Sequence, residues 1–311
     1  MAITAAMVKE LREMTGAGMM DCKKALNETN GNMDEAVEFL RKNGQAKAEK
    51  KASRIAAEGL CAVVTADEKT AAVVEVNSET DFVAKNETFQ EFVKAVAKQA
   101  VNTGAADLDA FLAEAWNEDG SKTVNDALVE KVAVIGENLK IRRFEKVVAE
   151  NGCVATYVHG GGRIGVIVDA ETSVVNDAVK EALVNIAMQI AALNPKYVSR
   201  DEVSAEYIAH EKEILLAQIM NDPKESQKPE KVINGMIEGR ISKELKEICL
   251  VDQVYVKAED GKQTVAKYLD EVSKAVGSTV KVKRFVRFET GEGIEKKQED
   301  FAAEVAAQMN A

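Results

Sequence analysis

Histidine and proline are scarce in this chain of 311 residues, which contains two histidines and three prolines. His159 and His210 are too few for a site that needs several imidazoles, which argues against most metal centres and histidine-based catalysis. The low proline content excludes Pro-rich linkers and favours long helices. The chain also lacks an apolar run of about 18 residues and a basic start followed by an apolar core, so we expect no membrane span and no signal peptide.

Cysteine is sparse as well. Cys22, Cys61, Cys153 and Cys249 are scattered along the chain and form no CxxC pair. This spacing argues against a tetrahedral zinc site, and four such cysteines are too few for a disulfide scaffold. We therefore predict that they are small buried side chains in a protein of a reducing, cytoplasmic compartment.

The charge is acidic overall but unevenly distributed. The net charge is −11, and hydrophobic residues make up 46% of the chain, which is typical of a globular protein. Residues 1–54 carry ten basic and eight acidic side chains, a net of +2, which leaves −13 for the remainder. The basic residues gather at 41–54, where we predict a solvated helix or tether. This run lacks interleaved aromatic residues, so we expect no direct nucleic-acid partner.

Residues 1–42 predict three short helices. Thr4 is placed to cap the first helix, and Leu11 belongs to its apolar stripe. Cys22 and Leu26 lie on the apolar face of the second helix. Such a small bundle is marginally stable alone.

Beyond this bundle the sequence repeats itself. Gly59 and Gly152 each open a predicted strand, a turn, a second strand and a Glu-Thr pair, and an apolar helix follows. Residues 135–144 also match residues 276–285. We therefore predict two similar α+β units in tandem, each with a hairpin, helices and a closing strand.

Residues 195–247 interrupt the second unit and predict a helical hairpin. A heptad seam is predicted at Val203, Tyr207, His210, Ile214 and Ala217, with Val232, Met236 and Ile241 on the second helix. The seam would be buried by pairing within the hairpin or with another subunit, so homodimerisation stays open. Residues 301–307 predict a short C-terminal helix that is too short to be stable alone.

A glycine-rich segment follows His159. Gly160, Gly162 and Gly165 satisfy the GxGxxG spacing of dinucleotide loops. Such a loop must lead into a helix N-terminus, whereas a strand is predicted here, so we interpret the segment as a hairpin turn. His159 is then an exposed turn residue, a hydrogen-bonding residue that fixes the turn, or a contact for a partner.

The segment Thr80, Asp81, Phe82 and Val83 follows a predicted buried strand and has two interpretations. In the first, Thr80 or Asp81 caps a helix and Phe82 is stapled against it. In the second, a carboxylate and a large ring are displayed together as a wedge that enters an apolar pocket while its charge perturbs a cation site. The pattern alone does not choose between them.

Five stretches are specific in combination. They are LREMTGAGMMDCKKAL at 11–26, EVNSETDFVA at 75–84, IGEN at 135–138, HGGGRIG at 159–165 and FETGEGIE at 288–295. In this order they resemble the bacterial translation elongation factor Ts family over essentially the whole chain. Residues 101–125 and 250–275 and the turn at 160–162 look longer than the family pattern.

The resemblance implies an α+β fold. Its parts are an N-terminal three-helix ubiquitin-associated-like module, a duplicated α+β core, a coiled-coil helical-hairpin insertion and a C-terminal helix. The implied boundaries are 1–54 for the module with its basic linker, 55–150 for the first core unit, 151–194 with 248–290 for the second, 195–247 for the insertion and 291–311 for the C-terminal module.

The resemblance also implies guanine nucleotide exchange on elongation factor Tu, with no enzymatic step, cofactor or metal of the chain's own. Within the segment from Thr80 to Val83, Asp81 and Phe82 match the pair that disturbs the partner's magnesium site. Further contacts with the partner are implied for Leu11, Met19, Met20, Ile135, Gly136 and His159.

Two functions of other classes compete with this one. An adaptor would bind its partner through residues 1–54 alone, with the core dispensable. An enzyme would hold a nucleotide at the glycine-rich turn. A truncation assay tests the adaptor, and direct nucleotide binding tests the enzyme.

Overall fold

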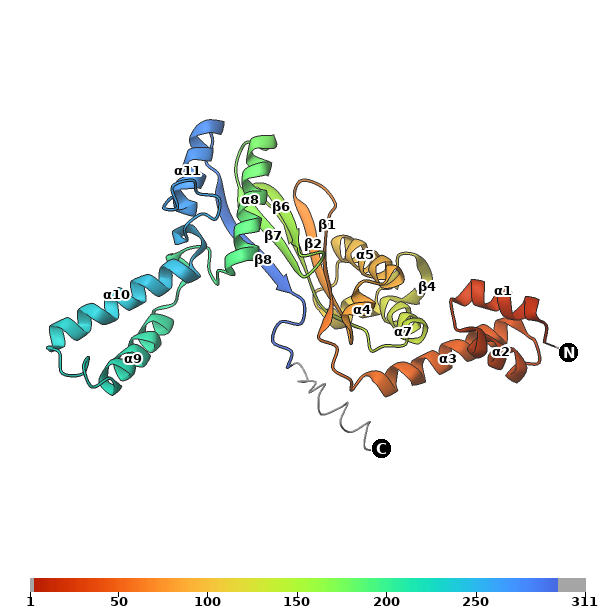
Figure 1. Ribbon diagram of the computed structural model, residues 1–311. Helices are drawn as coiled ribbons and strands as arrows, with labels where there is room; N and C mark the ends of the chain where they lie inside the picture. Colours follow the sequence, from red (N-terminus) through yellow and green to blue (C-terminus); the bar gives the residue numbers. More distant parts are fainter. Residues whose placement is uncertain (1–2, 296–311) are drawn as a thin grey trace.

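The chain folds into helices and antiparallel sheets, which is consistent with the predicted α+β class. The structure is a computed structural model that describes residues 3–295. In Figure 1 a helical bundle lies at the N-terminal end, two sheets lie in the centre and a helical hairpin projects from the other side. The predicted C-terminal helix at 301–307 lies outside the described residues.

The N-terminal bundle consists of α1 (Ala5–Thr15), α2 (Met19–Glu28) and α3 (Met33–Lys51). Thr4 caps α1 as predicted, because its side chain accepts a hydrogen bond from the backbone N–H of Met7 at 3.3 Å. Leu11, Cys22 and Leu26 are fully buried where the helices meet.

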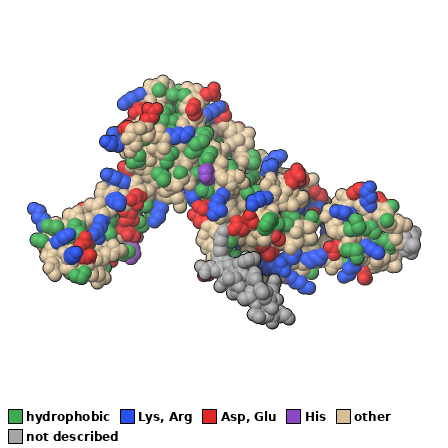
Figure 2. All heavy atoms as spheres, in the orientation of Figure 1, with side chains coloured by type: hydrophobic (Ala, Val, Ile, Leu, Met, Phe, Trp, Pro, Cys, Tyr) green, Lys and Arg blue, Asp and Glu red, His purple; other side chains and the backbone are tan. Residues whose placement is uncertain are grey.

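Helix α3 corrects one prediction. The third helix does not end near residue 42, and the basic run is not a free tether, because α3 continues to Lys51. Gly44 lies against Ala133 of α7 (Val124–Ile135), and Ala48 packs on the adjoining core. Small residues thus provide a narrow packing stripe, while the basic side chains remain outside, where Figure 2 shows Lys and Arg gathered along α3.

The first core unit has a three-stranded antiparallel sheet in the order β1 (Glu58–Thr65), β2 (Thr70–Ser78) and β5 (Lys140–Val148). The β1–β2 hairpin is confirmed, and Asp67 holds its turn by accepting hydrogen bonds from the N–H groups of Lys69 and Thr70. Helices α5 (Glu87–Asn102) and α7 cover one face of this sheet.

The second core unit repeats this arrangement. Its sheet has the order β6 (Gly152–His159), β7 (Ile164–Glu171) and β8 (Lys281–Glu289), and it is covered by α8 (Asp177–Leu193) and α11 (Val265–Val276). The sequence repeat at 135–144 and 276–285 therefore corresponds to a helix end, a turn and a closing strand in both units.

The two sheets pack face to face, and this contact joins the units. Val73 of β2 and Ile167 of β7 are fully buried between the sheets, with Phe288 of β8 beside them. Their neighbours in β2 and β7 point the other way, into the layers formed with the helices. Each central strand is consequently buried on both faces, which explains why its sequence is almost continuously apolar.

Several short elements have no counterpart in the predictions. They are α6 (Leu108–Ala113), β3 (Ala115–Trp116), β4 (Asp119–Thr123), η1 (Arg200–Glu202) and η2 (Leu250–Asp252). The residues between α5 and α7 therefore form a small helix and a two-stranded hairpin that cover the end of the first core. A further short helix, α4 (Asp81–Ala84), begins directly after Thr80.

The helical hairpin is formed by α9 (Ala205–Asn221) and α10 (Glu230–Ile248). Four residues of the predicted seam, Val203, Tyr207, Met236 and Ile241, are packed in it as predicted, whereas the other four are wrong. His210, Ile214, Ala217 and Val232 are exposed. The packed residues are Val203, Tyr207, Ile208, Leu215 and Ile219 against Ile233, Met236, Ile237, Ile241 and Leu245. Apolar residues occur on more than one face of α9, so heptad spacing alone fits two registers.

All four cysteines are free and buried, as predicted. Burial raises the pKa of each thiol, and that of Cys61 rises to about 11. These thiols are therefore protonated at neutral pH. Among residues 3–295, no helix has the length and apolar character that crossing a membrane requires.

The repeated glycines Gly59 and Gly152 provide a test of the fold. Their φ angles are +124° and +146°, and a Cβ on either would fall on a carbonyl oxygen of the neighbouring strand, that of Val76 or Ala170. We expect Gly59→Ala to lower the free energy of unfolding by about 3 kcal/mol, since it combines backbone strain with overpacking. Urea unfolding measures the change.

Gly261→Ala is the matched control. Gly261 also has a positive φ, +62°, but nothing lies within 4 Å of its added methyl group. Only the backbone term of about 1 kcal/mol should remain. Equal losses in the two variants would contradict the close strand packing at Gly59.

Candidate functional site

A short exposed segment after β2, which we call the tip, consists of Thr80, Asp81, Phe82 and Val83. Thr80 caps α4, since its hydroxyl accepts a hydrogen bond from the N–H of Val83 at 3.4 Å. Val83 is half-buried against the first core, and Ala84 behind it is buried. The tip is therefore anchored at both ends.

Phe82 is the most exposed large hydrophobic residue of the tip, with 79% of its surface accessible. The interpretation of Phe82 as a staple is wrong, although the cap at Thr80 is confirmed. Folding in water normally removes such a ring from solvent, so a single exposed phenylalanine on an anchored turn is typical of a contact surface.

Asp81 presents a carboxylate next to this ring. Its Oδ2 atom lies 2.6 Å from Nζ of Lys85, one helical turn further on. The hydrogen bond from Lys85 lowers the pKa of Asp81, so the carboxylate is ionised at neutral pH. The tip thus combines an apolar ring and a negative charge on adjacent residues.

The loop after α7 holds the tip from the side. Ile135 is half-buried at the end of α7, and Gly136 follows it at the surface. The next residue, Glu137, accepts hydrogen bonds from the N–H of Thr80 at 3.1 Å and from its hydroxyl at 2.6 Å. The predicted residues Ile135 and Gly136 thus belong to the loop that contacts the tip.

The end of α3 joins the same cluster. The ammonium group of Lys51 donates to the carbonyl oxygen of Gly136, and the guanidinium of Arg54 lies 3.4 Å from Glu79. The side chain of Asn138 donates to the carbonyl oxygen of Arg54 at 2.8 Å. The N-terminal bundle is therefore linked to the tip through a continuous set of polar contacts.

Within the N-terminal bundle, the predicted contact residues differ in exposure. Met19 and Met20, at the start of α2, are 57% and 74% exposed and can meet a partner. Leu11 is fully buried between the helices, so the prediction that it contacts a partner is wrong. Its side chain supports the exposed surface from inside the bundle.

His159 is exposed at the end of β6, where its Nδ1 atom lies 3.0 Å from the hydroxyl of Tyr157. The following glycines form the turn between β6 and β7, as predicted, so no helix N-terminus follows them. The carbonyl oxygen of Gly162 accepts a hydrogen bond from the N–H of Cys61 in β1 at 2.6 Å. The turn of the second unit thus packs on the first unit.

Strand β2 itself carries a buried carboxylate, that of Glu75. Glu75 is fully buried and accepts hydrogen bonds from Arg142 at 3.1 Å, from Arg143 at 2.6 Å and from the N–H of Gly291 at 2.8 Å. Arg143 also pairs with Glu292 at 3.0 Å. This network attaches the FETGEGIE stretch to the first sheet.

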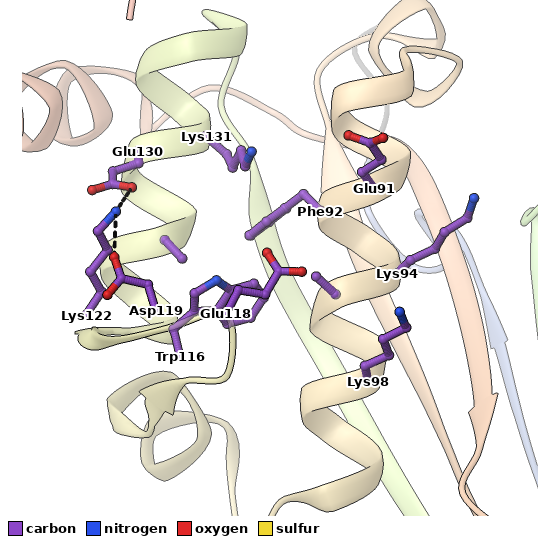
Figure 3. A pocket seen from close by; sticks show the side chains of 12 residues that line it. Glu91, Phe92, Lys94, Lys98, Trp116, Glu118, Asp119, Lys122, Glu130 and Lys131 are labelled. Carbon is purple, nitrogen blue, oxygen red and sulfur yellow. Dashed lines mark hydrogen bonds and ion pairs between the residues drawn. The ribbon is translucent and has the colours of Figure 1, made fainter. Parts of the chain in front are cut away.

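A cleft of about 540 Å³ lies between α5, α7 and β4, as Figure 3 shows. Phe92 and Trp116 form its apolar part, and Lys122 pairs with Asp119 and Glu130 at its side. No predicted site residue lines this cleft. Its walls are formed by α5, by α7 and by residues 116–122 between them.

Comparisons with known proteins point in one direction. The family model described as Elongation factor TS matches residues 79–292. Proteins called Elongation factor Ts from Clostridioides difficile, Clostridium tetani and Clostridium novyi are 55%, 52% and 51% identical to this chain. Each alignment covers 99% of this chain and 99% of the relative.

The Glu75 network gives a prediction about stability. Replacing Glu75 by Gln leaves Arg142 and Arg143 without their buried counter-charge, so we expect the free energy of unfolding to fall by about 3 kcal/mol at pH 7. The matched control is Glu145→Gln, which breaks an exposed pair with Arg284 and should change stability by less than about 1 kcal/mol.

The same variant tests the pH dependence. Burial raises the pKa of Glu75, but hydrogen bonds from Gly291, Asn77 and Arg142 and the charge of Arg143 outweigh it, so its pKa lies below the ordinary 4.5. The unfolded chain therefore binds this proton more readily, and the stability is present above pH 4.5 and lost as pH falls through the folded pKa. The free energy of unfolding of Glu75→Gln should therefore fall less steeply between about pH 5 and pH 3 than that of the parent chain. Parallel curves would contradict this.

Proposed function

The chain belongs to the elongation factor Ts family, and from this premise we propose that it binds elongation factor Tu with GDP and promotes GDP release and GTP reloading. The observation that carries the proposal is the tip, where an exposed ring and an ionised carboxylate are held on an anchored turn. Family membership supports the role in translation elongation and a cytoplasmic location.

The proposed mechanism involves binding only. Phe82 enters an apolar surface of the partner beside its nucleotide site, and Asp81 brings a negative charge towards the magnesium ion there. That ion neutralises the diphosphate of GDP, so disturbing its position weakens GDP binding. We propose no covalent step for the chain itself, and hence no enzymatic activity.

Thermodynamic coupling explains why such a factor accelerates nucleotide exchange without determining whether the partner ends up with GDP or GTP bound. If binding of the factor weakens GDP binding, then GDP weakens binding of the factor by the same ratio. Both nucleotides can displace the factor, and GTP reloads the partner by mass action. The factor therefore accelerates exchange, and the nucleotide concentrations set its outcome.

The rest of the proposed contact surface comes from three parts of the fold. Met19 and Met20 on α2 dock on the partner's G domain in this proposal, which their exposure supports, and the exposed His159 extends the surface onto the second unit. Ile135 and Gly136 act beside the tip. An adaptor built on residues 1–54 alone is less well supported, because α3 packs along α7 and contacts the loop behind the tip.

Homodimerisation through the helical hairpin stays a proposal. Ile214, Leu216, Met220 and Val232 are exposed on α9 and α10, with accessible fractions between 37% and 54%. These residues offer an apolar surface outside the internal seam. Sedimentation of the full chain measures its oligomeric state.

Phe82→Ala tests the proposed role of the ring. Because the ring is exposed, the melting temperature should change by less than about 2 °C. The maximal rate of GDP release from elongation factor Tu, measured by stopped flow with labelled GDP, should fall by about tenfold or more. Val254→Ala removes a different exposed apolar side chain, one that is 48% accessible, and should leave the rate unchanged. A parental rate for Phe82→Ala would refute the proposed wedge.

A further inference from the structure

The duplicated core provides an internal comparison for the tip. Glu79 and Thr80 of the first unit correspond to Glu171 and Thr172 of the second, since both pairs lie where the central strand of their sheet ends. Residues that the shared fold requires should act alike in both units. Differences at matched positions therefore indicate what one unit has added.

In the first unit, Glu137 is placed to control the tip. Its carboxylate accepts hydrogen bonds from the N–H groups of Glu79 and Thr80 at 3.0 and 3.1 Å. The Thr80 hydroxyl donates to it at 2.6 Å, which leaves a lone pair of that hydroxyl for the N–H of Val83. One carboxylate thus fixes the residue that caps the turn carrying Phe82.

The opposite loop is held in return. A carboxylate oxygen of Glu79 accepts a hydrogen bond from the N–H of Asn138 at 2.6 Å, so each loop binds the backbone of the other. Asn138 is 8% exposed, and its amide group reaches the carbonyl oxygen of Arg54. This reciprocal pattern, which we call the loop clamp, leaves the tip little freedom to tilt.

The second unit lacks this clamp at the matched position. Ser278 stands where Glu137 stands, and its hydroxyl contacts Ser173 alone in the matched loop, at 2.8 Å from the Ser173 hydroxyl and as acceptor from the Ser173 N–H at 3.4 Å. The Thr172 hydroxyl bonds within its own loop, to the backbone of Val174, and the Thr172 N–H donates to the carbonyl oxygen of Asn151 at 3.1 Å. No helix forms between Thr172 and Asn176. Val174, at the place of Phe82, is half-buried. The shared fold therefore needs neither the carboxylate nor the exposed ring.

We infer that Glu137 is a positioning residue for nucleotide exchange, which fixes the direction in which Phe82 meets the partner through the loop clamp. This inference rests on the proposed function. It assigns Glu137 no contact with nucleotide or metal. Its effect passes through Thr80 to the turn at 81–84.

Glu137→Ala in the full-length chain tests the inference. It removes the acceptor for both donors of Thr80 and for the N–H of Glu79, so the maximal rate of GDP release at saturating factor should fall by about tenfold. Hydrogen exchange at the N–H of Val83 should become faster, because the Thr80 cap loosens. Glu137→Gln keeps the size but replaces one acceptor oxygen by a donor group, and it serves if the alanine variant does not fold.

A double variant separates positioning from a general structural effect. If Glu137 acts through the ring, adding Glu137→Ala to Phe82→Ala should slow release by less than about twofold further. Independent effects would multiply instead and would overturn the inference. Ser278→Ala, the matched change in the second unit, should leave the release rate as in the parent.

Failure of the inference and failure of the proposed function give different results. A parental release rate for both Glu137 variants, with Phe82→Ala slow, overturns the inference alone. A chain that does not accelerate GDP release at all removes the proposed function. In that case unchanged hydrogen exchange at Val83 in the Glu137 variants would show separately that the loop clamp does not hold the tip.

Discussion

An exposed aromatic ring keeps a defined position in water only if the backbone on both sides of it is fixed to the fold. Phe82 meets this requirement through Thr80, which caps the turn, and through Val83 and Ala84, which pack on the first core. The buried carboxylate of Glu75 in β2 accepts a hydrogen bond from the N–H of Gly291, which follows β8, and so attaches the end of the second sheet to the first. The first core unit and the loop at Glu137 thus support this exposed turn.

The duplicated core shows how one fold can supply both stability and function. Both units have the same strand order and the same covering helices, and the face-to-face packing of their sheets buries each central strand on both sides. In the second unit the loop after the central strand is short and half-buried around Val174. In the first unit it carries Asp81 and Phe82 outward, and no reactive thiol or imidazole cluster is needed for the proposed binding mechanism.

Period-two patterns and the internal repeat were sufficient to predict both hairpins and the two tandem units. The register of the helical hairpin was not predictable, because Ile214 and Leu215 are both apolar and only tertiary packing selects Leu215. The sequence did not predict the full length of α3, because the residues on its packed face, Gly44 and Ala48, are small and give only a weak apolar periodicity. The sequence did not predict the exposure of Phe82, because a ring that packs against its helix and a ring that is exposed to solvent follow the same sequence pattern.

Glu137 shows the same limit at the candidate site. Its contacts join loops that lie 57 residues apart in sequence, so no local pattern reveals them. Leu11 shows the opposite limit. It lies within the stretch at 11–26 that resembles the family, but its side chain is buried, so it supports the proposed contact surface from inside and does not reach it. Motif resemblance therefore predicted the regions of the candidate site, while burial and hydrogen bonds showed which of their side chains are exposed and which support the exposed ones.

The central claim is that the displayed ring and carboxylate act through the partner's magnesium site. The most direct measurement is the rate of GDP release from elongation factor Tu, with and without this chain, as magnesium is titrated from millimolar concentration to full chelation. The account predicts a large acceleration at millimolar magnesium that shrinks towards none when the ion is removed, because its loss has then already weakened GDP binding. An acceleration of the same size at every magnesium concentration would contradict it.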